Sequence, residues 1–256
     1  MSSVINTNVK SMFASAALST NERQMNVAMN QLSTGKRTYS AQVDAAGLAL
    51  ADKLTSQIRG TQMAVKNIND GISFLQTAEG ALNEITNMGQ RMYELAVQME
   101  NGTLDSDQTS SIETEMDDLG TAIDDIVANT VWNDTDTADF SIDLTIAGDG
   151  TTDTFTATSL GTTPTSASAA SAISTFLATV ATQRGEAGSA INRLGYMADN
   201  LSNLAANLSA SRSRTMDTDY ASASAELART QIIQQAATAM LAQANQSSQS
   251  VLSLLK

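Results

Sequence analysis

Apolar residues recur every seven positions within residues 1–34 and again within residues 45–100. Leu18, Met25 and Leu32 follow this spacing within residues 1–34, and Gly35 is a suitable residue to end a helix. Residues 45–100 keep a helical pattern throughout, and a helix of that length would be about 80 Å long. A compact domain of this size cannot cover such a helix with its own core, so the pattern predicts partner helices.

After residue 100 the spacing of the apolar residues changes twice. A shorter helix is expected from about residue 105 to 128, and then residues 140–146 alternate apolar and polar side chains before the turn residues 148–150 and a Thr-rich stretch. Heptad spacing returns after Pro164, breaks at residues 217–219, and resumes to the end of the chain. The predicted fold is therefore mainly α, with long antiparallel coiled-coil-like helices and a small central β-hairpin at about 138–162.

Charge is unevenly distributed along this sequence. Residues 103–160 hold 14 acidic residues and no Lys or Arg, whereas the rest of the chain holds 13 acidic and 14 basic residues. An acidic, solvated middle repels nucleic acid and anionic membranes, so neither is an expected partner. No apolar run has the length of a membrane span, and the first residues lack the pattern of a secretory signal peptide.

Composition argues against catalysis. The chain contains neither His nor Cys, which excludes the usual nucleophilic triads and most zinc sites. A Ser–Lys dyad or paired carboxylates remain formally open, but the acidic residues lie in an aromatic-poor region that offers no pocket. We therefore expect no enzyme activity, no metal and no cofactor.

Five glycines lie inside the long helical pattern, and each costs about 1 kcal/mol relative to Ala. They are Gly47, Gly60, Gly71, Gly80 and Gly89. We interpret them as positions where a neighbouring helix approaches the backbone closely; the alternative is tolerated imperfection.

Several runs of residues resemble one family in order and position. They include Ile5-Asn-Thr-Asn8, Asp44-Ala-Ala-Gly-Leu-Ala-Leu-Ala-Asp52, Asn69-Asp-Gly-Ile-Ser73, Gln76-Thr-Ala-Glu-Gly-Ala-Leu-Asn-Glu-Ile85, Ser211-Arg-Ser-Arg214 and Val251-Leu-Ser-Leu-Leu255. These runs are similar to both terminal regions of bacterial flagellin, and the resemblance covers roughly 200 of the 256 residues, leaving out the middle.

The resemblance implies a structural subunit of the extracellular flagellar filament, used for motility. Residues 1–40 and 216–256 would together form the inner terminal coiled-coil domain, and residues 41–215 a second-shell bundle without a large outer domain. The resemblance also implies flagellar type III export of the unfolded chain without a cleaved signal peptide. An export chaperone and the filament cap are then partners besides other copies of the chain itself.

The heptad residues of the two ends are the expected assembly interface. They are Leu18, Met25, Leu32, Ile233, Met240, Val251, Leu252 and Leu255. Two other interpretations remain open: the hook–filament junction protein, which is a flagellin relative, and a soluble coiled-coil adaptor.

One further segment, residues 90–98, resembles the part of flagellin that a vertebrate toll-like receptor recognises. Arg91 and Leu95 match its principal contacts, and Glu115 matches the supporting acid on the following helix. Tyr93 departs from the pattern, since well-recognised members usually carry a second Arg there.

Overall fold

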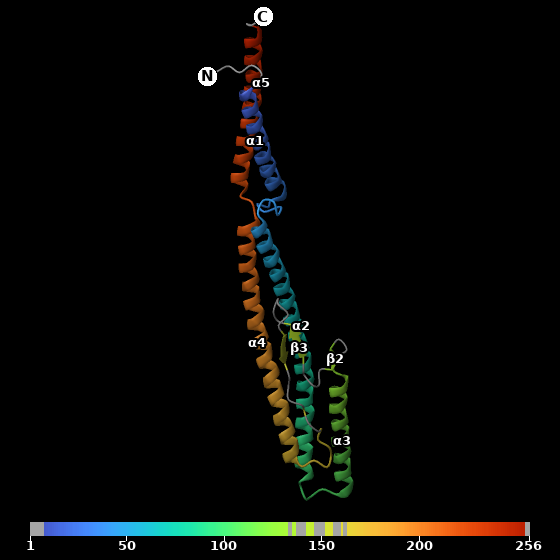
Figure 1. Cartoon of the computed structure of the whole chain (residues 1–256). Coiled ribbons are helices and arrows are strands. Elements are labelled where there is room, and N and C mark those ends of the chain that lie inside the picture. The colour runs from blue at the N-terminus through green and yellow to red at the C-terminus, as the bar shows by residue number, and fades with distance from the viewer. Residues whose placement is uncertain are drawn as a thin grey trace. The chain divides into compact units, whose positions relative to one another are not determined.

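The computed structural model describes residues 8–132, 135–136, 142–145, 152–155, 160 and 163–253, with side chains for residues 8–132, 160 and 163–246. Five helices lie within these residues: α1 (Val9–Thr34), α2 (Ala45–Met99), α3 (Ser106–Asn129), α4 (Ala170–Met216) and α5 (Tyr220–Ser253) (Figure 1). The prediction of a mainly α protein with long helices is confirmed, whereas the coiled-coil geometry stays a prediction.

The helices begin and end at residues that suit those positions. Asn8 caps α1 by accepting a hydrogen bond from the Ser11 amide at 3.1 Å, and Gly35 ends α1 with a left-handed φ of 67°. Asp105 starts α3 in a capping box with Gln108. Local sequence therefore determines where these helices stop.

The described strands form two small antiparallel pairs. β3 (Ile142–Thr145) pairs with β4 (Thr152–Phe155), with Ile142 opposite Phe155. These strands lie inside the predicted hairpin of residues 138–162, although its turn at 148–150 is outside the described residues. β1 (Val131–Trp132) pairs with β2 (Thr135–Asp136), a contact that alternation did not indicate because each strand has two residues.

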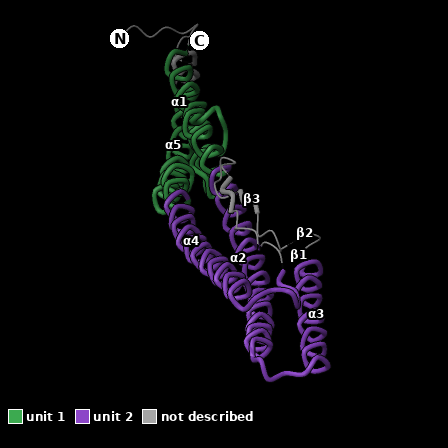
Figure 2. Tube along the Cα trace, turned by 90° about the horizontal axis from the view of Figure 1, so that it is seen from below, with its two compact units in different colours: residues 1–55, 209–256 green, residues 56–208 purple. Residues whose placement is uncertain are grey.

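The chain divides into two compact units (Figure 2). The first contains residues 1–55 and 209–256, and the second contains residues 56–208. These limits fall inside α2 and α4, whereas the predicted domains divide at residues 40 and 216, near the breaks in helical pattern. The assignment of those domains to shells of a filament remains a proposal.

The core of the second unit is made of large apolar side chains from α2, α3 and α4. One cluster includes Leu82, Ile85, Met92, Met116, Ile123, Ile173 and Phe176. A second cluster joins α2 to α4 through Ile68, Phe74, Leu75, Ala190 and Leu194, and the Trp132 ring stands edge-on to Phe74 at a centroid distance of 6.2 Å. Burial of these side chains is the main stabilising contribution in this unit.

A buried amide lies between these clusters. Gln183 of α4 is 1 % exposed, and neither its Oε1 nor its Nε2 has a hydrogen-bond partner in the part of the chain that the structure describes. Its neighbours along α4 are Val180, in the first cluster, and Ala187, which is also buried. A buried polar group without a protein partner is costly, which makes this position a candidate for an apolar substitution.

The glycines of α2 differ in their surroundings. A Cβ on Gly89 would lie 2.8 Å from Cδ2 of Leu177 in α4, which is the close approach of a neighbouring helix that we expected. A Cβ on Gly80 would meet nothing within 4 Å, and the three atoms nearest to one on Gly47 all belong to Asp44, whose side chain accepts a hydrogen bond from the Gly47 amide. The expectation is therefore confirmed at Gly89 and wrong at Gly80, whereas the nearest atoms at Gly47 belong to the start of its own helix.

Two carboxylates of α3 accept hydrogen bonds from the segment that leads into α4. Asp117 accepts a hydrogen bond from the Ser166 amide at 2.9 Å, and Asp124 accepts one from the Thr163 hydroxyl. Pro164 is buried between them, where its carbonyl oxygen lies 3.0 Å from the position of a Cβ on Gly120. The hydrogen bond from the Ser166 backbone, followed by that from its side chain, lowers the pKa of Asp117 below its ordinary value.

Candidate assembly surface

The terminal helices α1 and α5 pack against each other in antiparallel orientation. Asn8 Nδ2 donates to the Ala244 carbonyl oxygen at 3.3 Å near one end, and the Thr218 amide donates to the Gly35 carbonyl oxygen at 3.0 Å near the other. Between them, Asn21 Nδ2 donates to the Thr230 carbonyl oxygen at 2.7 Å. These three bonds define the register of the pair.

The contact between α1 and α5 buries only small or polar residues. The buried side chains on these helices are Asn21, Ala28, Ala223 and Thr230, and no large apolar side chain described on either helix is buried. Residues 21 and 28 are seven apart, as are 223 and 230, so the Asn21–Thr230 register places Ala28 opposite Ala223. Small layers bring the helices together but leave their larger apolar residues at the margin of the contact.

Where α1 and α4 end, the two chain segments bond to each other. Lys36 and Asp217 form an isolated antiparallel bridge, and the Arg37 amide donates to the Met216 carbonyl oxygen at 2.7 Å. The Arg37 guanidinium also donates to the Thr215 carbonyl oxygen at 2.8 Å. Arg37 thus satisfies two terminal carbonyls of α4, and its positive charge suits a helix C-terminus.

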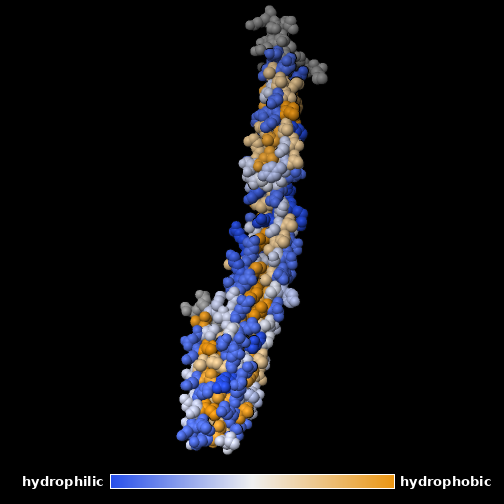
Figure 3. Space-filling model, turned by 180° about the vertical axis from the view of Figure 1, so that it is seen from behind, coloured by the Kyte–Doolittle hydropathy of each residue, from blue (hydrophilic) through white to orange (hydrophobic). Residues whose placement is uncertain are grey.

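Large apolar side chains are exposed along both terminal helices, where apolar and polar patches alternate on the surface (Figure 3). Phe13 is 74 % exposed, Met12 64 %, and Ile232 and Met240 66 % each. We call the full set the terminal apolar surface, and it consists of Val9, Met12, Phe13, Met29, Tyr220, Ile232, Ile233 and Met240. Large apolar side chains exposed in this number along one helix pair indicate an interaction site.

Few charges accompany this surface. Lys10, Glu22 and Arg23 are the charged residues of α1, and Glu226 and Arg229 those of α5. Glu226 and Arg229 form an ion pair in which the Arg229 hydrogen bond lowers the pKa of Glu226. Paired or sparse charges reduce the desolvation cost of covering the surface with another protein.

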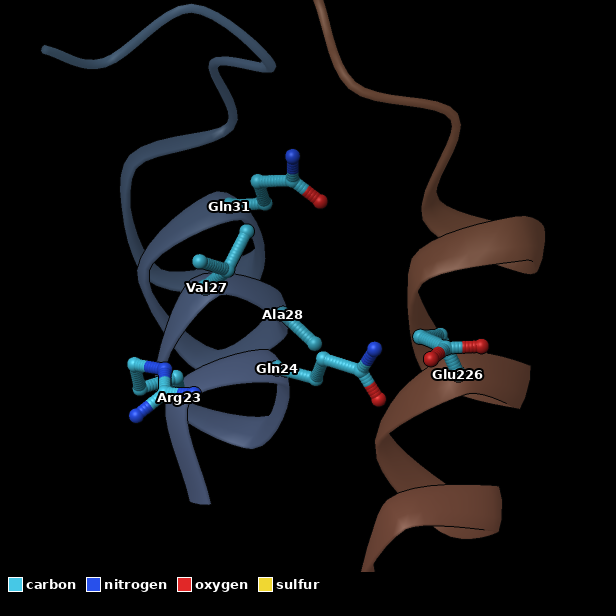
Figure 4. A pocket seen from close by; sticks show the side chains of 6 residues that line it. All are labelled: Arg23, Gln24, Val27, Ala28, Gln31 and Glu226. Atoms are coloured by element: carbon cyan, nitrogen blue, oxygen red, sulfur yellow. The ribbon is translucent and has the colours of Figure 1, made fainter. Parts of the chain in front are cut away.

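A shallow groove runs between the two helices beside Ala28 (Figure 4). Gln24 and Gln31 line it from α1, and Glu226 lines it from α5. Its lining is mixed, and it contains no arrangement of nucleophile and base. Elsewhere in the described residues there is no cluster of acidic side chains suited to a metal ion, and no helix long and apolar enough to cross a membrane.

The residues predicted for assembly occupy different places. Leu18, Met25 and Leu32 are half-buried at the margin of the α1–α5 contact, whereas Ile233 is 39 % exposed. Met240 is 66 % exposed. Val251 and Leu252 belong to the helical backbone of α5, but their side chains are outside the description, and Leu255 lies outside the described residues altogether.

Heptad reasoning found Met240 but missed other highly exposed apolar residues of the terminal helices. Met12, Phe13 and Ile232 do not share the seven-residue spacing of the predicted set, so a search for one stripe passed over them. The available signal was the pairing of apolar residues in Met12-Phe13 and Ile232-Ile233 on helices with few charges. Such pairs widen the apolar face beyond what one partner helix can cover.

The predicted receptor segment lies in the second unit. Arg91 Nη2 contacts Glu115 Oε1 at 2.8 Å and Arg91 Nη1 contacts Glu94 Oε2 at 3.3 Å, and the hydrogen bond with Glu115 is the main cause that raises the pKa of Arg91. The ion pair is about half exposed and links α2 to α3. Leu95 is only 2 % exposed, so its side chain is packed in the core beneath this surface.

Family comparison matches most of the sequence. The bacterial flagellin N-terminal helical region matches residues 5–137, and the bacterial flagellin C-terminal helical region matches residues 170–255. The first of these alone spans more than half of the 256 residues.

Individual relatives align along their whole length. The chain is 40 % identical to a flagellin of Halalkalibacterium halodurans, covering 99 % of this chain and 100 % of the relative. It is 35 % identical to a flagellar filament 33 kDa core protein of Treponema phagedenis, with 99 % and 100 % covered. A flagellin B of Vibrio cholerae is 30 % identical over 371 aligned positions, covering 98 % of this chain and 99 % of that one.

A crystal structure of Bacillus cereus flagellin aligns with a TM-score of 0.41 and 25 % identity, covering 56 % of this chain and 88 % of that one. At that score the superposition does not establish a shared arrangement.

Proposed function

Because the chain belongs to the bacterial flagellin family, we propose that it assembles with copies of itself through the terminal apolar surface of α1 and α5. The protein is a structural subunit of the flagellar filament and not an enzyme. Its function is self-association, and the filament that it builds is extracellular.

The observation that carries this proposal is the exposure of Phe13, Met12, Ile232 and Met240 on two helices that bury no large apolar residue against each other. Fully burying one such side chain contributes about 1.5–3 kcal/mol. A few of them per contact, repeated at every subunit, are enough to hold a polymer without covalent links. The half-buried Leu18, Met25 and Leu32 would add to the same contacts once a neighbouring subunit covers them.

Within the filament we propose that residues 1–40 and 216–256 form the inner domain and residues 41–215 the next shell. The junction at Gly35 and Asp217 supports that division, because both chain segments leave their helices at the same place. The proposed architecture has no large outer domain. In support, the alignment with the Vibrio cholerae flagellin spans 371 positions, whereas this chain has only 256 residues, so part of that relative has no counterpart here.

We further propose the route by which the subunit reaches the filament. By resemblance to the family, the chain travels unfolded through the flagellar type III export channel, with an export chaperone holding its C-terminal segment beforehand. It then folds and adds beneath a cap at the filament tip. Because α5 has few charges and exposes apolar residues, a chaperone that covers this helix before export would shield those residues from solvent.

Recognition by a toll-like receptor is proposed for the second unit. The accessible groups there are the Arg91–Glu115 ion pair and Tyr93, which is 41 % exposed. Leu95 would contribute by packing beneath the Arg91 backbone, rather than by direct contact with the receptor. This recognition is incidental to the filament role.

The other candidates are not favoured. A soluble coiled-coil adaptor does not account for matches to both flagellin terminal regions, and the relatives described above are named as flagellins and a filament core protein rather than as junction proteins.

A matched pair of variants tests the proposed surface. Ile232→Ser with Met240→Ser should prevent polymerisation, measured as loss of sedimentable protein, while leaving the second unit folded. Tyr196→Ser is the control, because Tyr196 is 77 % exposed but lies in the second unit. If the α5 variant polymerised like the unmodified chain, α5 would not be the assembly surface.

A further inference from the structure

The turn between α2 and α3 carries the only Asn-Gly pair in the sequence. Asn101 and Gly102 follow the end of α2 at Met99 and precede the Asp105 cap of α3, and both are exposed. The turn is held by two backbone hydrogen bonds, from the Asn101 amide to the Gln98 carbonyl oxygen at 3.1 Å and from the Leu104 amide to the Asn101 carbonyl oxygen at 3.3 Å. Neither bond involves the Asn101 side chain or the Gly102 amide.

We propose that Asn101 is a site of spontaneous covalent modification by deamidation, with Gly102 supplying the nucleophile and water the only co-reactant. The deprotonated Gly102 backbone nitrogen attacks Cγ of Asn101, and the new N–Cγ bond closes a five-membered succinimide ring. The Cγ–Nδ2 bond breaks, and the nitrogen leaves as ammonia with the protons it needs. Water then opens the ring at either carbonyl, which gives aspartate or isoaspartate at position 101. No electrons are transferred.

The reaction requires a free nucleophile and a free carboxamide. Within the described residues, the Gly102 amide donates no backbone hydrogen bond and the Asn101 side chain makes none. A Cβ at residue 102 would meet nothing within 4 Å, so no neighbouring side chain crowds the backbone there. Glycine has no Cβ to obstruct ring closure and adopts the required backbone conformations more easily than any other residue.

Exposed asparagines within the described part of α2 lack this freedom. Asn83 and Asn87 are exposed on α2, but the amide of the residue that follows each of them lies in the helix interior. Such an amide donates to the carbonyl four residues earlier, and the helical backbone holds it away from the preceding side chain. The turn at residue 101 therefore differs from these sites in geometry as well as in sequence.

Modification changes the charge and the backbone of the turn. Either product adds a carboxylate next to the C-terminus of α2, where a negative charge is unfavourable, and close in sequence to Glu100 and Asp105. Isoaspartate also lengthens the main chain by one carbon, and this displaces the carbonyl that accepts from the Leu104 amide. Leu104 packs against the core cluster shared by α2, α3 and α4, so the α2–α3 connection should loosen.

Peptide mapping of the aged full-length protein tests the proposal. Cleavage after Glu100 and Glu113 gives the peptide of residues 101–113, and cleavage after Glu84 and Glu94 gives residues 85–94 with Asn87 as internal control. On incubation of the folded protein in ¹⁸O-labelled water, we expect residues 101–113 to exchange the amide for a carboxyl carrying one labelled oxygen, faster at higher pH. The product should separate into aspartate and isoaspartate forms, and residues 85–94 should keep their mass.

Three variants distinguish the effect of the Asn-Gly sequence from the effect of its place in an exposed turn. Gly102→Ala should slow the modification strongly, and Asn101→Gln should abolish it, because both leave the turn exposed but hinder or enlarge the ring. Glu84→Gly creates the same Asn-Gly pair inside α2, and we expect Asn83 to stay unmodified there while the helix is folded. An unchanged mass for residues 101–113, an equal rate in Gly102→Ala, or equal modification of Asn83 in Glu84→Gly would overturn the proposal.

Discussion

Asn21 of α1 and Thr230 of α5 are 209 residues apart in sequence, yet the Asn21 side chain donates to the Thr230 carbonyl oxygen at 2.7 Å and both residues are buried. This bond lies in the middle of a helix pair that otherwise buries alanines. Apolar area alone contributes little there, so a single polar contact has a large share in holding α1 against α5.

We predict that Asn21→Ala weakens the α1–α5 pair by about 1 kcal/mol or less, because the loss of the Nδ2 hydrogen bond is partly offset by removal of Oδ1, which is buried without a partner among the described residues. Polymers of this variant should dissociate at a lower temperature than those of the unmodified chain, measured by light scattering. The control is Asn26→Ala, an exposed asparagine on the same helix. Equal dissociation temperatures for the two variants would mean that the Asn21 bond does not stabilise the pair.

Two glycines of α2 should respond differently to alanine. Gly80→Ala should stabilise the second unit by about 1 kcal/mol, because it improves helix propensity in open space. Gly89→Ala should gain less, since Leu177 must leave its rotamer at a cost of about 0.5–1.5 kcal/mol. Thermal unfolding followed by circular dichroism measures both. A larger gain at residue 89 than at residue 80 would contradict the close approach of α4.

Replacing the buried amide should also stabilise the second unit. Gln183→Met keeps the length of the side chain and removes two polar atoms that lack partners, so we expect a gain of about 1–3 kcal/mol in the free energy of unfolding. Gln90→Met, at an exposed position of α2, controls for the general effect of methionine. Should Gln183→Met lower the stability instead, the amide would have to be satisfied, for example by a buried water.

The hydrogen bond between Asp117 and the segment before α4 should weaken in acid. The folded-state pKa of Asp117 is lowered from 3.8, so its contribution is present above the unfolded pKa and is lost as pH falls through the folded value. Asp117→Asn should therefore flatten the dependence of the melting temperature on pH below 3.8, compared with Asp118→Asn at the next exposed residue. Parallel pH profiles for the two variants would show that the Ser166 contact does not affect stability.

Much of the fold could be predicted because local signals fix it. Gly35, Asp44 and Asp105 mark helix ends in the sequence and hold them in the structure. The alternation that predicts β3 and the Thr-rich stretch that predicts β4 are likewise local patterns.

Contacts between distant residues were harder to foresee. Nothing near Arg37 in the sequence indicates that it caps α4, and nothing near Gln183 indicates a core position, because Gln is ordinarily exposed. The resemblance that suggested Leu95 as a receptor contact likewise carried no information on its burial in the core. Some highly exposed apolar residues, such as Phe13, were missed because a single stripe describes one partner helix, whereas a polymer subunit has several neighbours.

Electron microscopy of the purified, unmodified chain tests the central claim most directly. Concentrated protein, free of other flagellar components, should form long tubes of uniform width, and the Ile232→Ser, Met240→Ser variant should form none under the same conditions. Long tubes from both proteins would contradict assembly through the terminal apolar surface. A purified chain that stays monomeric or gives only amorphous aggregate would contradict the account of a self-assembling subunit.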